Sequence, residues 1–184
     1  MVPDMTNSDL VRVSKRLALH LRHAPERIGI ELEEGGWVGV DALLAALGRH
    51  GLPLTRAELA EVVERNDKRR FAFDDSGTRI RASQGHSVAV ELDLPVSIPP
   101  AALFHGSRFL PAILREGLRP MRRHDVHLSA TRSTAMTVGA RRGEPVLLRV
   151  DAAAMAAEGH EFRVSANGVW LTRHVPPGYL TRLQ

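Results

Sequence analysis

The strongest constraint on the fold is a proline-rich stretch near the middle of the chain, residues 93–102 (DLPVSIPPAA). Proline restricts φ and lacks a backbone N–H, so this stretch is predicted to run as an extended connection without helix. The sequence pattern also changes across it, from long runs with helical spacing to short β-like runs. The sequence therefore predicts two domains, residues 1–92 and 103–184, joined by a linker at 93–102.

The first half has the pattern of helices followed by a hairpin. Apolar residues at helical spacing predict a helix over residues 8–23, with Ser8 or Asp9 as its N-cap. A second helix is expected in VDALLAALGRHG, capped by Asp41, and a third in TRAELAEVVERND, which opens with a Thr-x-x-Glu capping box. The runs RFAF and TRIRA, joined by DDSG, predict two short strands. Three helices followed by a two-stranded wing are typical of a winged-helix domain.

The second half alternates short β-like runs with short helical stretches. The β-like runs are ALFHGS, VHLSA, PVLLRVD and GVWLT, and the helical stretches are FLPAILREG and RSTAMTVGARRG. We therefore expect a mixed, strand-rich second domain and an α+β chain overall.

The composition limits the kinds of partner that the protein is expected to bind. The net charge of +4 and the pI near 10.5 favour a polyanionic partner, although all basic residues except Lys15 and Lys68 are arginine, a bias that a GC-rich genome also produces. The absence of cysteine excludes disulfides and thiolate metal sites. No segment approaches the roughly 18 apolar residues of a membrane span, and no signal-peptide pattern opens the chain. We expect a cytoplasmic monomer that does not contact a membrane.

Arginine and histidine gather in two short motifs of the first half. Arg22 and His23 (LRHAPE) end the first predicted helix, where cations are also favoured by the helix dipole, by about 0.3–1 kcal/mol. Arg81 and His86 (RASQGH) follow the predicted hairpin, where Arg81 is either a solvated arginine of the wing or an anion ligand. Gly85 allows a turn with positive φ that brings backbone amides close to an anion. Arginine suits phosphate because its planar fork donates two parallel hydrogen bonds.

Two histidine motifs stand in β-like runs of the second half. His105, Gly106 and Ser107 form FHGS, and His127 and Ser129 belong to VHLSA. A histidine in such a place is more often structural than functional, but two of them beside small hydroxyl residues are typical of a cleft lining. The nine histidines show no close His-x-His or HExxH spacing, so metal binding is poorly supported.

A further arginine pair, Arg141 and Arg142 in VGARRGEP, is either a phosphate ligand or a charged turn. No GxGxxG motif follows a strand and no GxxxxGK[ST] loop is present, so Rossmann and P-loop nucleotide binding are unsupported.

Taken in order, several long motifs closely resemble the RNA 2′-phosphotransferase family, also called tRNA 2′-phosphotransferases. They are SKRLALHLRHAPERIGIELEEGGWVGVDALL, IRASQGHSV, LFHGS, REGLRPMRRHDVHLSA, VGARRGEPVLLRVDA and SANGVWLTRHVPPGYL, covering about residues 12–181. The resemblance implies an N-terminal winged-helix lobe and a C-terminal ADP-ribosyltransferase-like lobe, with the active site in the cleft between them. The second lobe would bind NAD without a Rossmann fold.

The resemblance also implies a reaction in tRNA splicing and processing. An internal 2′-phosphate of RNA attacks the nicotinamide-bearing ribose carbon of NAD and expels nicotinamide. The ribose 2″-hydroxyl then attacks the phosphorus, which releases RNA with a free 2′-hydroxyl and ADP-ribose 1″,2″-cyclic phosphate. No metal is expected to take part.

The family's catalytic residues, three arginines and a histidine, match positions in both halves of this sequence. By this resemblance Arg22 and Arg81 hold the 2′-phosphate, and His23 helps with proton movement or phosphate contact. The family pattern Val-Gly-x-Arg-x-Gly favours Arg141 over Arg142 as the third arginine, whereas His86 is assigned to the structure of its turn. The residues implied to contact NAD are His105, Gly106, Ser107, His127, Leu128, Ser129 and Gly139.

Two alternatives stay open on the sequence. One is ADP-ribosylation of terminal phosphates on nucleic acids, which uses only the first step. The other is a winged-helix nucleic-acid-binding protein without catalysis. The third predicted helix is too acidic to read a major groove, and this argues against the second alternative.

Overall fold

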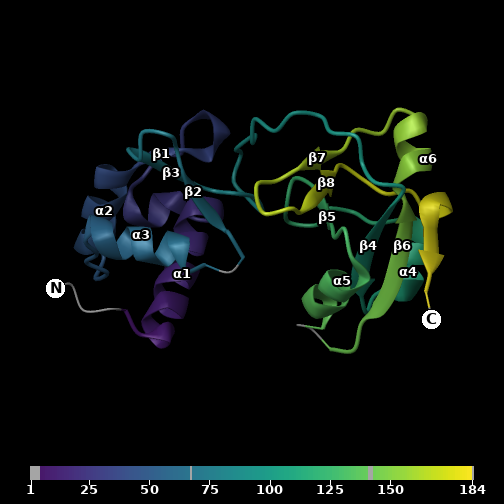
Figure 1. Cartoon of the computed structure of the whole chain (residues 1–184), viewed down its shortest axis with the longest axis horizontal. Coiled ribbons are helices and arrows are strands. Elements are labelled where there is room, and N and C mark those ends of the chain that lie inside the picture. The colour runs from purple at the N-terminus through teal and green to yellow at the C-terminus, as the bar shows by residue number, and fades with distance from the viewer. Residues whose placement is uncertain (1–4, 67, 141–142, 184) are drawn as a thin grey trace. The chain divides into compact units, whose positions relative to one another are not determined.

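The computed structural model describes residues 5–66, 68–140 and 143–183 (Figure 1). The chain forms two compact units, unit 1 up to Asp93 and unit 2 from Leu94. Both units mix helices with small antiparallel sheets, which confirms the predicted α+β class. Across the described ranges, no helix has both the length and the apolar character needed to cross a bilayer.

Unit 1 holds most of the long helices of the described chain together with one small sheet. Its strands form a three-stranded antiparallel sheet in the order β1-β3-β2, in which Ile80 lies opposite both Val38 and Phe73. The predicted hairpin is confirmed as β2 and β3, whereas the short strand β1 was not predicted. The elements are α1 (Asn7–Arg22), η1 (Pro25–Ile28), η2 (Glu34–Gly36), β1 (Val38–Gly39), α2 (Val40–Arg49), α3 (Arg56–Glu64), β2 (Phe71–Phe73) and β3 (Arg79–Ala82).

The helix starts differ in part from the prediction. The N-cap of α1 is Thr6 and not Ser8 or Asp9, because the Thr6 hydroxyl accepts the Asp9 backbone N–H at 3.2 Å and donates to the Asp9 carboxylate at 2.6 Å. Helix α2 has no side-chain cap, and Asp41 instead pairs with Arg56 at 2.8 Å. The capping box at the start of α3 is confirmed, with both of its hydrogen bonds present.

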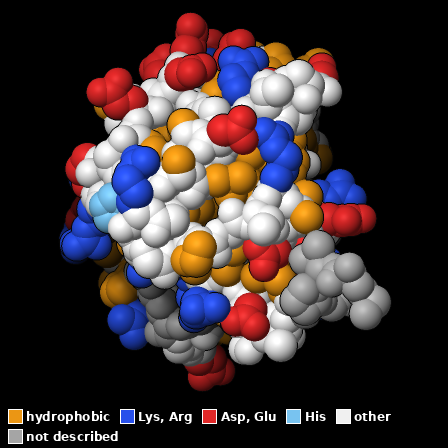
Figure 2. All heavy atoms as spheres, turned by 90° about the vertical axis from the view of Figure 1, so that its left-hand side faces the viewer, with side chains coloured by type: hydrophobic (Ala, Val, Ile, Leu, Met, Phe, Trp, Pro, Cys, Tyr) orange, Lys and Arg blue, Asp and Glu red, His pale blue; other side chains and the backbone are white. Residues whose placement is uncertain are grey.

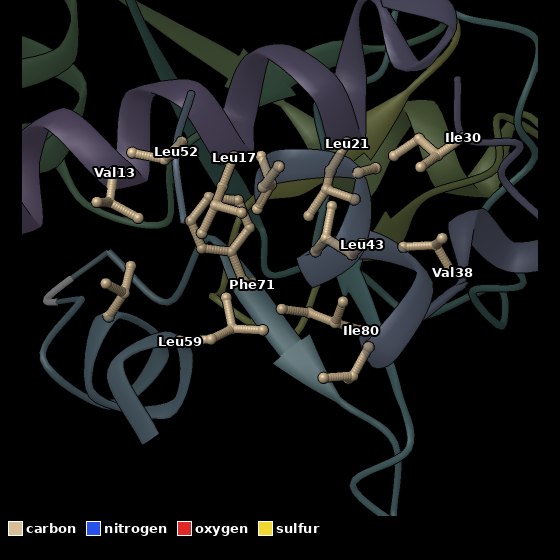
Figure 3. Close-up of a cluster of buried hydrophobic side chains, with 14 of the residues drawn as sticks. Val13, Leu17, Leu21, Ile30, Val38, Leu43, Leu52, Leu59, Phe71 and Ile80 are labelled. Atoms are coloured by element: carbon tan, nitrogen blue, oxygen red, sulfur yellow. The ribbon is translucent and has the colours of Figure 1, made fainter. Parts of the chain in front are cut away.

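The core of unit 1 lies between α1 and the sheet. Val13, Leu17 and Leu21 form one apolar stripe along α1 and are at most 1% exposed. Phe71 and Ile80 approach this stripe from the strands (Figure 3). Burial of each large apolar side chain contributes roughly 1.5–3 kcal/mol, so this stripe fixes α1 over the hairpin.

Unit 2 contains two three-stranded antiparallel sheets, β4-β6-β9 and β5-β8-β7. They are joined where Phe104 and Ser129 exchange backbone hydrogen bonds, each 2.8 Å long. Of the elements, α6, β7, η3 and β9 were not predicted. The elements are β4 (Ala102–Ser107), α4 (Leu110–Glu116), β5 (Val126–Leu128), α5 (Arg132–Gly139), β6 (Val146–Asp151), α6 (Ala152–Ala157), β7 (Arg163–Val164), β8 (Trp170–Thr172), η3 (Pro177–Tyr179) and β9 (Leu180–Arg182).

Unit 2 has its own core, separate from that of unit 1. Leu103, Leu148 and Val150 of the first sheet are fully buried, and Met155 of α6 and Phe162 pack with them. Each unit therefore has an apolar core of its own, as expected for a compact domain.

Helix α5 lies directly against strand β4 because glycines face each other at the contact. A Cβ added to Gly106 would collide with the backbone carbonyl oxygen of Ala135. A Cβ added to Gly139 would lie 2.8 Å from the carbonyl group of Gly106. Since these neighbours are backbone atoms, they cannot move aside as a flexible side chain would.

We predict that Gly106→Ala lowers the free energy of unfolding by about 1–3 kcal/mol, because the added methyl group pushes α5 away from β4. Gly48→Ala is the matched control, since Gly48 lies in α2 with no atom within 4 Å of the added Cβ. The control is expected to stabilise the protein by up to about 1 kcal/mol through helix propensity. Urea unfolding followed by circular dichroism measures both, and a Gly106→Ala variant as stable as the wild type contradicts the close packing.

Candidate active-site residues

Arg22 and His23 stand at the C-terminal end of α1, as predicted, and both are held by other segments. The guanidinium Nη2 of Arg22 donates to the carbonyl of Arg70 at 3.4 Å. The carbonyl of Arg22 accepts the backbone N–H of Ser87 at 2.9 Å, and the ring Nδ1 of His23 lies 2.9 Å from the Ser87 hydroxyl. The last carbonyls of a helix lack partners within it, so the segment after β3 closes this helix end.

The stretch from Arg81 to Ser87 leads from the sheet back to α1. The backbone N–H of Ser83 donates to the Arg70 carbonyl at 2.8 Å, the same oxygen that accepts from Arg22. Gly85, with φ of 88°, then turns the chain toward the helix end. The structure thus brings Arg22, His23 and the stretch that begins at Arg81 into one place within unit 1.

Arg81 is held from two sides by the turn EEGGW, residues 33–37. Its guanidinium carbon lies 4.4 Å from the centre of the Trp37 ring, and its Nη1 donates to the carbonyl of Gly35 at 3.3 Å. Burial lowers the pKa of Arg81, opposed by the negative charge of Asp93, yet an arginine stays protonated in proteins. The sequence reasoning missed Trp37, whose signal is a large aromatic ring in an otherwise polar, glycine-containing turn.

His86 is only 3% exposed and packs against the same turn. A Cβ added to Gly36 would lie 3.1 Å from its Nε2. This burial agrees with the assignment of His86 to the structure of its own turn, the one at Gly85.

In unit 2 the two predicted histidines lie side by side. Nδ1 of His105 is 3.1 Å from the carbonyl of His127, and Nη1 of Arg123 is 3.0 Å from Nδ1 of His127. A carbonyl only accepts and a guanidinium only donates, so Nδ1 carries the proton in His105 and a lone pair in His127. In their neutral forms, Nε2 therefore accepts in His105 and donates in His127. Arg123 was not picked out from the sequence.

The other positions expected to contact NAD have defined local roles. The Ser107 hydroxyl accepts the backbone N–H of Phe109 at 3.2 Å, and Leu128 is 1% exposed within the core. Leu128 can thus offer a ligand little beyond its backbone. Gly106 and Gly139 meet in the contact between β4 and α5, which by itself accounts for glycine at both positions.

Arg141 and Arg142 lie outside the described residues. The prediction that Arg141 takes part in the site, and the choice between the two arginines, therefore stay predictions.

Burial lowers the pKa of His105 from its ordinary value of 6.5, while the hydrogen bond to His127 opposes the shift. The unfolded chain takes up this proton at a higher pH than the folded chain, so the contribution of His105 to stability is complete above about pH 6.5 and is lost as the pH falls toward the folded pKa. We predict that wild type loses more unfolding free energy between pH 7.5 and 5.5 than His105→Asn does.

A proton NMR titration, with the His105 ring signal assigned by its disappearance in His105→Asn, measures the pKa directly. We expect a midpoint below 6.5, and a midpoint at or above 6.5 contradicts the burial argument.

Comparison with known proteins places this chain in one family over most of its length. Residues 8–174 match the model of the RNA 2′-phosphotransferase, Tpt1/KptA family. A probable RNA 2′-phosphotransferase of Streptomyces coelicolor is 64% identical over 178 residues, covering 96% of this chain and 97% of the relative. A protein of the same name from Trichormus variabilis is 52% identical over 178 residues, with 96% and 98% covered. The chain therefore belongs to the RNA 2′-phosphotransferase, Tpt1/KptA family.

Proposed function

We propose that this protein is a transferase that uses NAD to remove an internal 2′-phosphate from RNA. The observation that carries the proposal is that the segment which begins at Arg81 closes the end of α1 at Arg22 and His23. Each of these three side chains is held by other parts of unit 1. Family membership supports the same reading, since the compared relatives are named probable RNA 2′-phosphotransferases.

We further propose that residues 1–92 form a winged-helix lobe, 93–102 a linker and 103–184 an ADP-ribosyltransferase-like lobe. The element order α1-β1-α2-α3-β2-β3, with an antiparallel sheet ordered β1-β3-β2, supports the first assignment. Two small antiparallel sheets that meet at Phe104 and Ser129 support the second.

The 2′-phosphate is assigned to unit 1. A phosphate monoester carries between one and two negative charges near neutral pH, and Arg22 and Arg81 supply cations whose positions are already fixed. Trp37 and the Gly35 carbonyl hold the Arg81 guanidinium, so little reorganisation is needed when the phosphate binds. Preorganised donors of this kind are the usual source of charge stabilisation in phosphoryl transfer.

NAD is assigned to unit 2, and the donors present fit it. Nε2 of His105 as an acceptor and Nε2 of His127 as a donor suit hydroxyl groups of ribose, and Arg123 supplies a cation next to His127. Ser107 and Ser129 add hydroxyl groups. The backbone of Gly106 lies in β4, between His105 and Ser107. NAD supplies a ribose carbon that carries a leaving group, together with the neighbouring 2″-hydroxyl.

The residues of unit 1 act on the phosphate in both steps. First, Arg22 and Arg81 orient a 2′-phosphate oxygen, which forms the new bond to the ribose carbon while the bond to nicotinamide breaks. Next, the 2″-oxygen bonds to phosphorus, and the bond from phosphorus to the RNA 2′-oxygen breaks. The 2″-hydroxyl loses a proton and the RNA oxygen gains one, and the exposed ring of His23 is placed to move it. Arg141 is proposed as the third arginine of the site.

Among the described residues, no group of three or more His, Asp or Glu side chains is gathered in a way that would hold a metal ion. Arg22 and Arg81 are the residues to which we assign charge stabilisation.

Arg81→Ala tests the assignment. We predict a loss of about 100- to 1,000-fold in the rate of phosphate removal, because one preorganised donor to the phosphate disappears. Single-turnover reactions with NAD and an RNA that carries one internal 2′-phosphate separate nicotinamide release from formation of phosphate-free RNA. We expect phosphate-free RNA to form more slowly, whether or not nicotinamide release also slows.

Arg79→Ala is the matched control for Arg81→Ala. Arg79 lies on the same strand and also over the Trp37 ring, at 5.4 Å, but it is exposed and bonded to Asp74 at 3.0 Å. We expect this variant to keep a rate close to that of wild type. Equal rates for Arg81→Ala and Arg79→Ala would remove the role of Arg81. Nicotinamide release without phosphate removal by wild type would instead favour ADP-ribosylation of phosphates.

A further inference from the structure

Unit 1 carries a hollow of about 330 Å³, and none of the proposed site residues that the structure describes lines it. Its walls are one face of α1, the end of α3, and the loop between α3 and β2. We name this hollow the α1 groove. Its lining includes Val11, Lys15 and Ala18 of α1, and Arg65, Lys68 and Arg70 of the loop.

The α1 groove is basic. Four of its lining residues are cations, and none of the lining residues that the structure describes is a carboxylate. Arg65 is paired with Glu61 at 2.5 Å, and Nη1 of Arg70 donates to Oδ1 of Asn66 at 3.5 Å. The two lysines are the only ones in the sequence, and both line this groove. Asp67 falls between loop residues in the sequence and lies outside the described residues.

The groove leads to the proposed phosphate ligands. Val11, Lys15, Ala18 and Arg22 follow one another at spacings of four, three and four residues, so they share one face of α1. Seven residues of helix rise about 10 Å, which is the separation of Lys15 from Arg22 along the axis. At the other wall, the Arg70 carbonyl accepts the hydrogen bond from the Arg22 guanidinium.

The face of unit 1 that Figure 2 shows is less suited to a polyanion. The face with α2 and α3, on the left of Figure 1, shows acidic and basic side chains interspersed around exposed apolar ones (Figure 2). Cations gathered in a groove neutralise successive phosphates of a strand, whereas interspersed charges of both signs do not.

We propose that the α1 groove binds the phosphodiester backbone of RNA next to the nucleotide that carries the 2′-phosphate. The position relative to that nucleotide rests on the proposed function, because it assumes that Arg22 holds the 2′-phosphate. Lys15 and Lys68 contact backbone phosphates as mobile point charges, without reading the base sequence. Val11, a residue that is 48% exposed, offers an apolar surface to the sugars between the phosphates.

The test is a comparison of two double variants that lose the same charge. Lys15→Gln/Lys68→Gln removes the two lysines of the groove. Arg16→Gln/Arg49→Gln removes two exposed cations of the same unit that do not line it, and Arg16 points about 100° around α1 from Lys15. Fluorescence anisotropy measures binding of a short single-stranded RNA without any 2′-phosphate, in the absence of NAD and over a range of salt concentrations.

The lysine variant is expected to bind this RNA at least about tenfold more weakly than the control variant. The slope of log K against log salt concentration should fall by about 1.4, or 0.7 for each lost phosphate contact. The lysine variant should unfold at the urea concentration of the wild type, because both lysines are exposed. The control is expected to unfold at a slightly lower concentration, because Arg16 donates to the carbonyl of His50 at 3.2 Å. Equal affinities and equal salt slopes for the two variants would overturn the proposal.

A second measurement separates this inference from the proposed function. A dinucleotide with a 2′-phosphate has almost no flanking backbone, so wild type and the lysine variant should process it at equal rates, whereas a longer RNA should show a raised KM in the lysine variant. A lower rate on the dinucleotide would place the lysines in the reaction itself and overturn the groove assignment. If wild type releases no nicotinamide with either substrate, the proposed function fails, and the anisotropy comparison still decides the groove.

Discussion

The hydrogen bond between the Arg22 carbonyl and the Ser87 backbone N–H, 2.9 Å long, fixes the end of α1 against the segment that follows β3. The last carbonyls of a helix need hydrogen-bond donors from outside the helix, and here the donor lies in the segment that begins at Arg81. The carbonyl of Arg70 adds a second tie, because it accepts from both Ser83 and the Arg22 guanidinium. Backbone hydrogen bonds thereby set the places of the side chains proposed to hold the phosphate.

Helix α1 performs two tasks with different faces. Val13, Leu17 and Leu21 anchor it in the core of unit 1, and this anchoring makes the helix a rigid support. On another face, Lys15 lines the groove and Arg22 stands at the end of the helix. A site on such a helix is held more precisely than one on loops alone.

The two units differ in the electrostatic character of the proposed site residues. Arg22 and Arg81 of unit 1 carry permanent charges, since the guanidinium does not titrate in the physiological range. In unit 2, burial lowers the pKa of His105 and keeps it neutral at neutral pH, so its ring serves as a hydrogen-bonding group. This contrast suits a phosphate in the first unit and ribose hydroxyl groups in the second.

The sequence by itself determined the elements whose signals are local. The capping box of α3, the hairpin of β2 and β3, and the strand Ala102–Ser107 each depend on neighbouring residues, and each was predicted. The positions of Arg22 and His23 at a helix end were predicted for the same reason. Short elements such as α6, with six residues, carry too little periodic pattern to be found.

Tertiary structure decided the contacts between residues far apart in the chain. Asp41 was expected to cap α2, but Arg56, fifteen residues away, offers it an ion pair instead. The stacking of Arg81 on Trp37 and the bond between Arg123 and His127 also depend on how the chain folds back. The α1 groove likewise exists only because the loop before β2 lies against α1, bringing Lys15 and Lys68 to one surface. In the sequence such cations lie far apart, and only the fold determines which of them lie close enough to act on the same ligand.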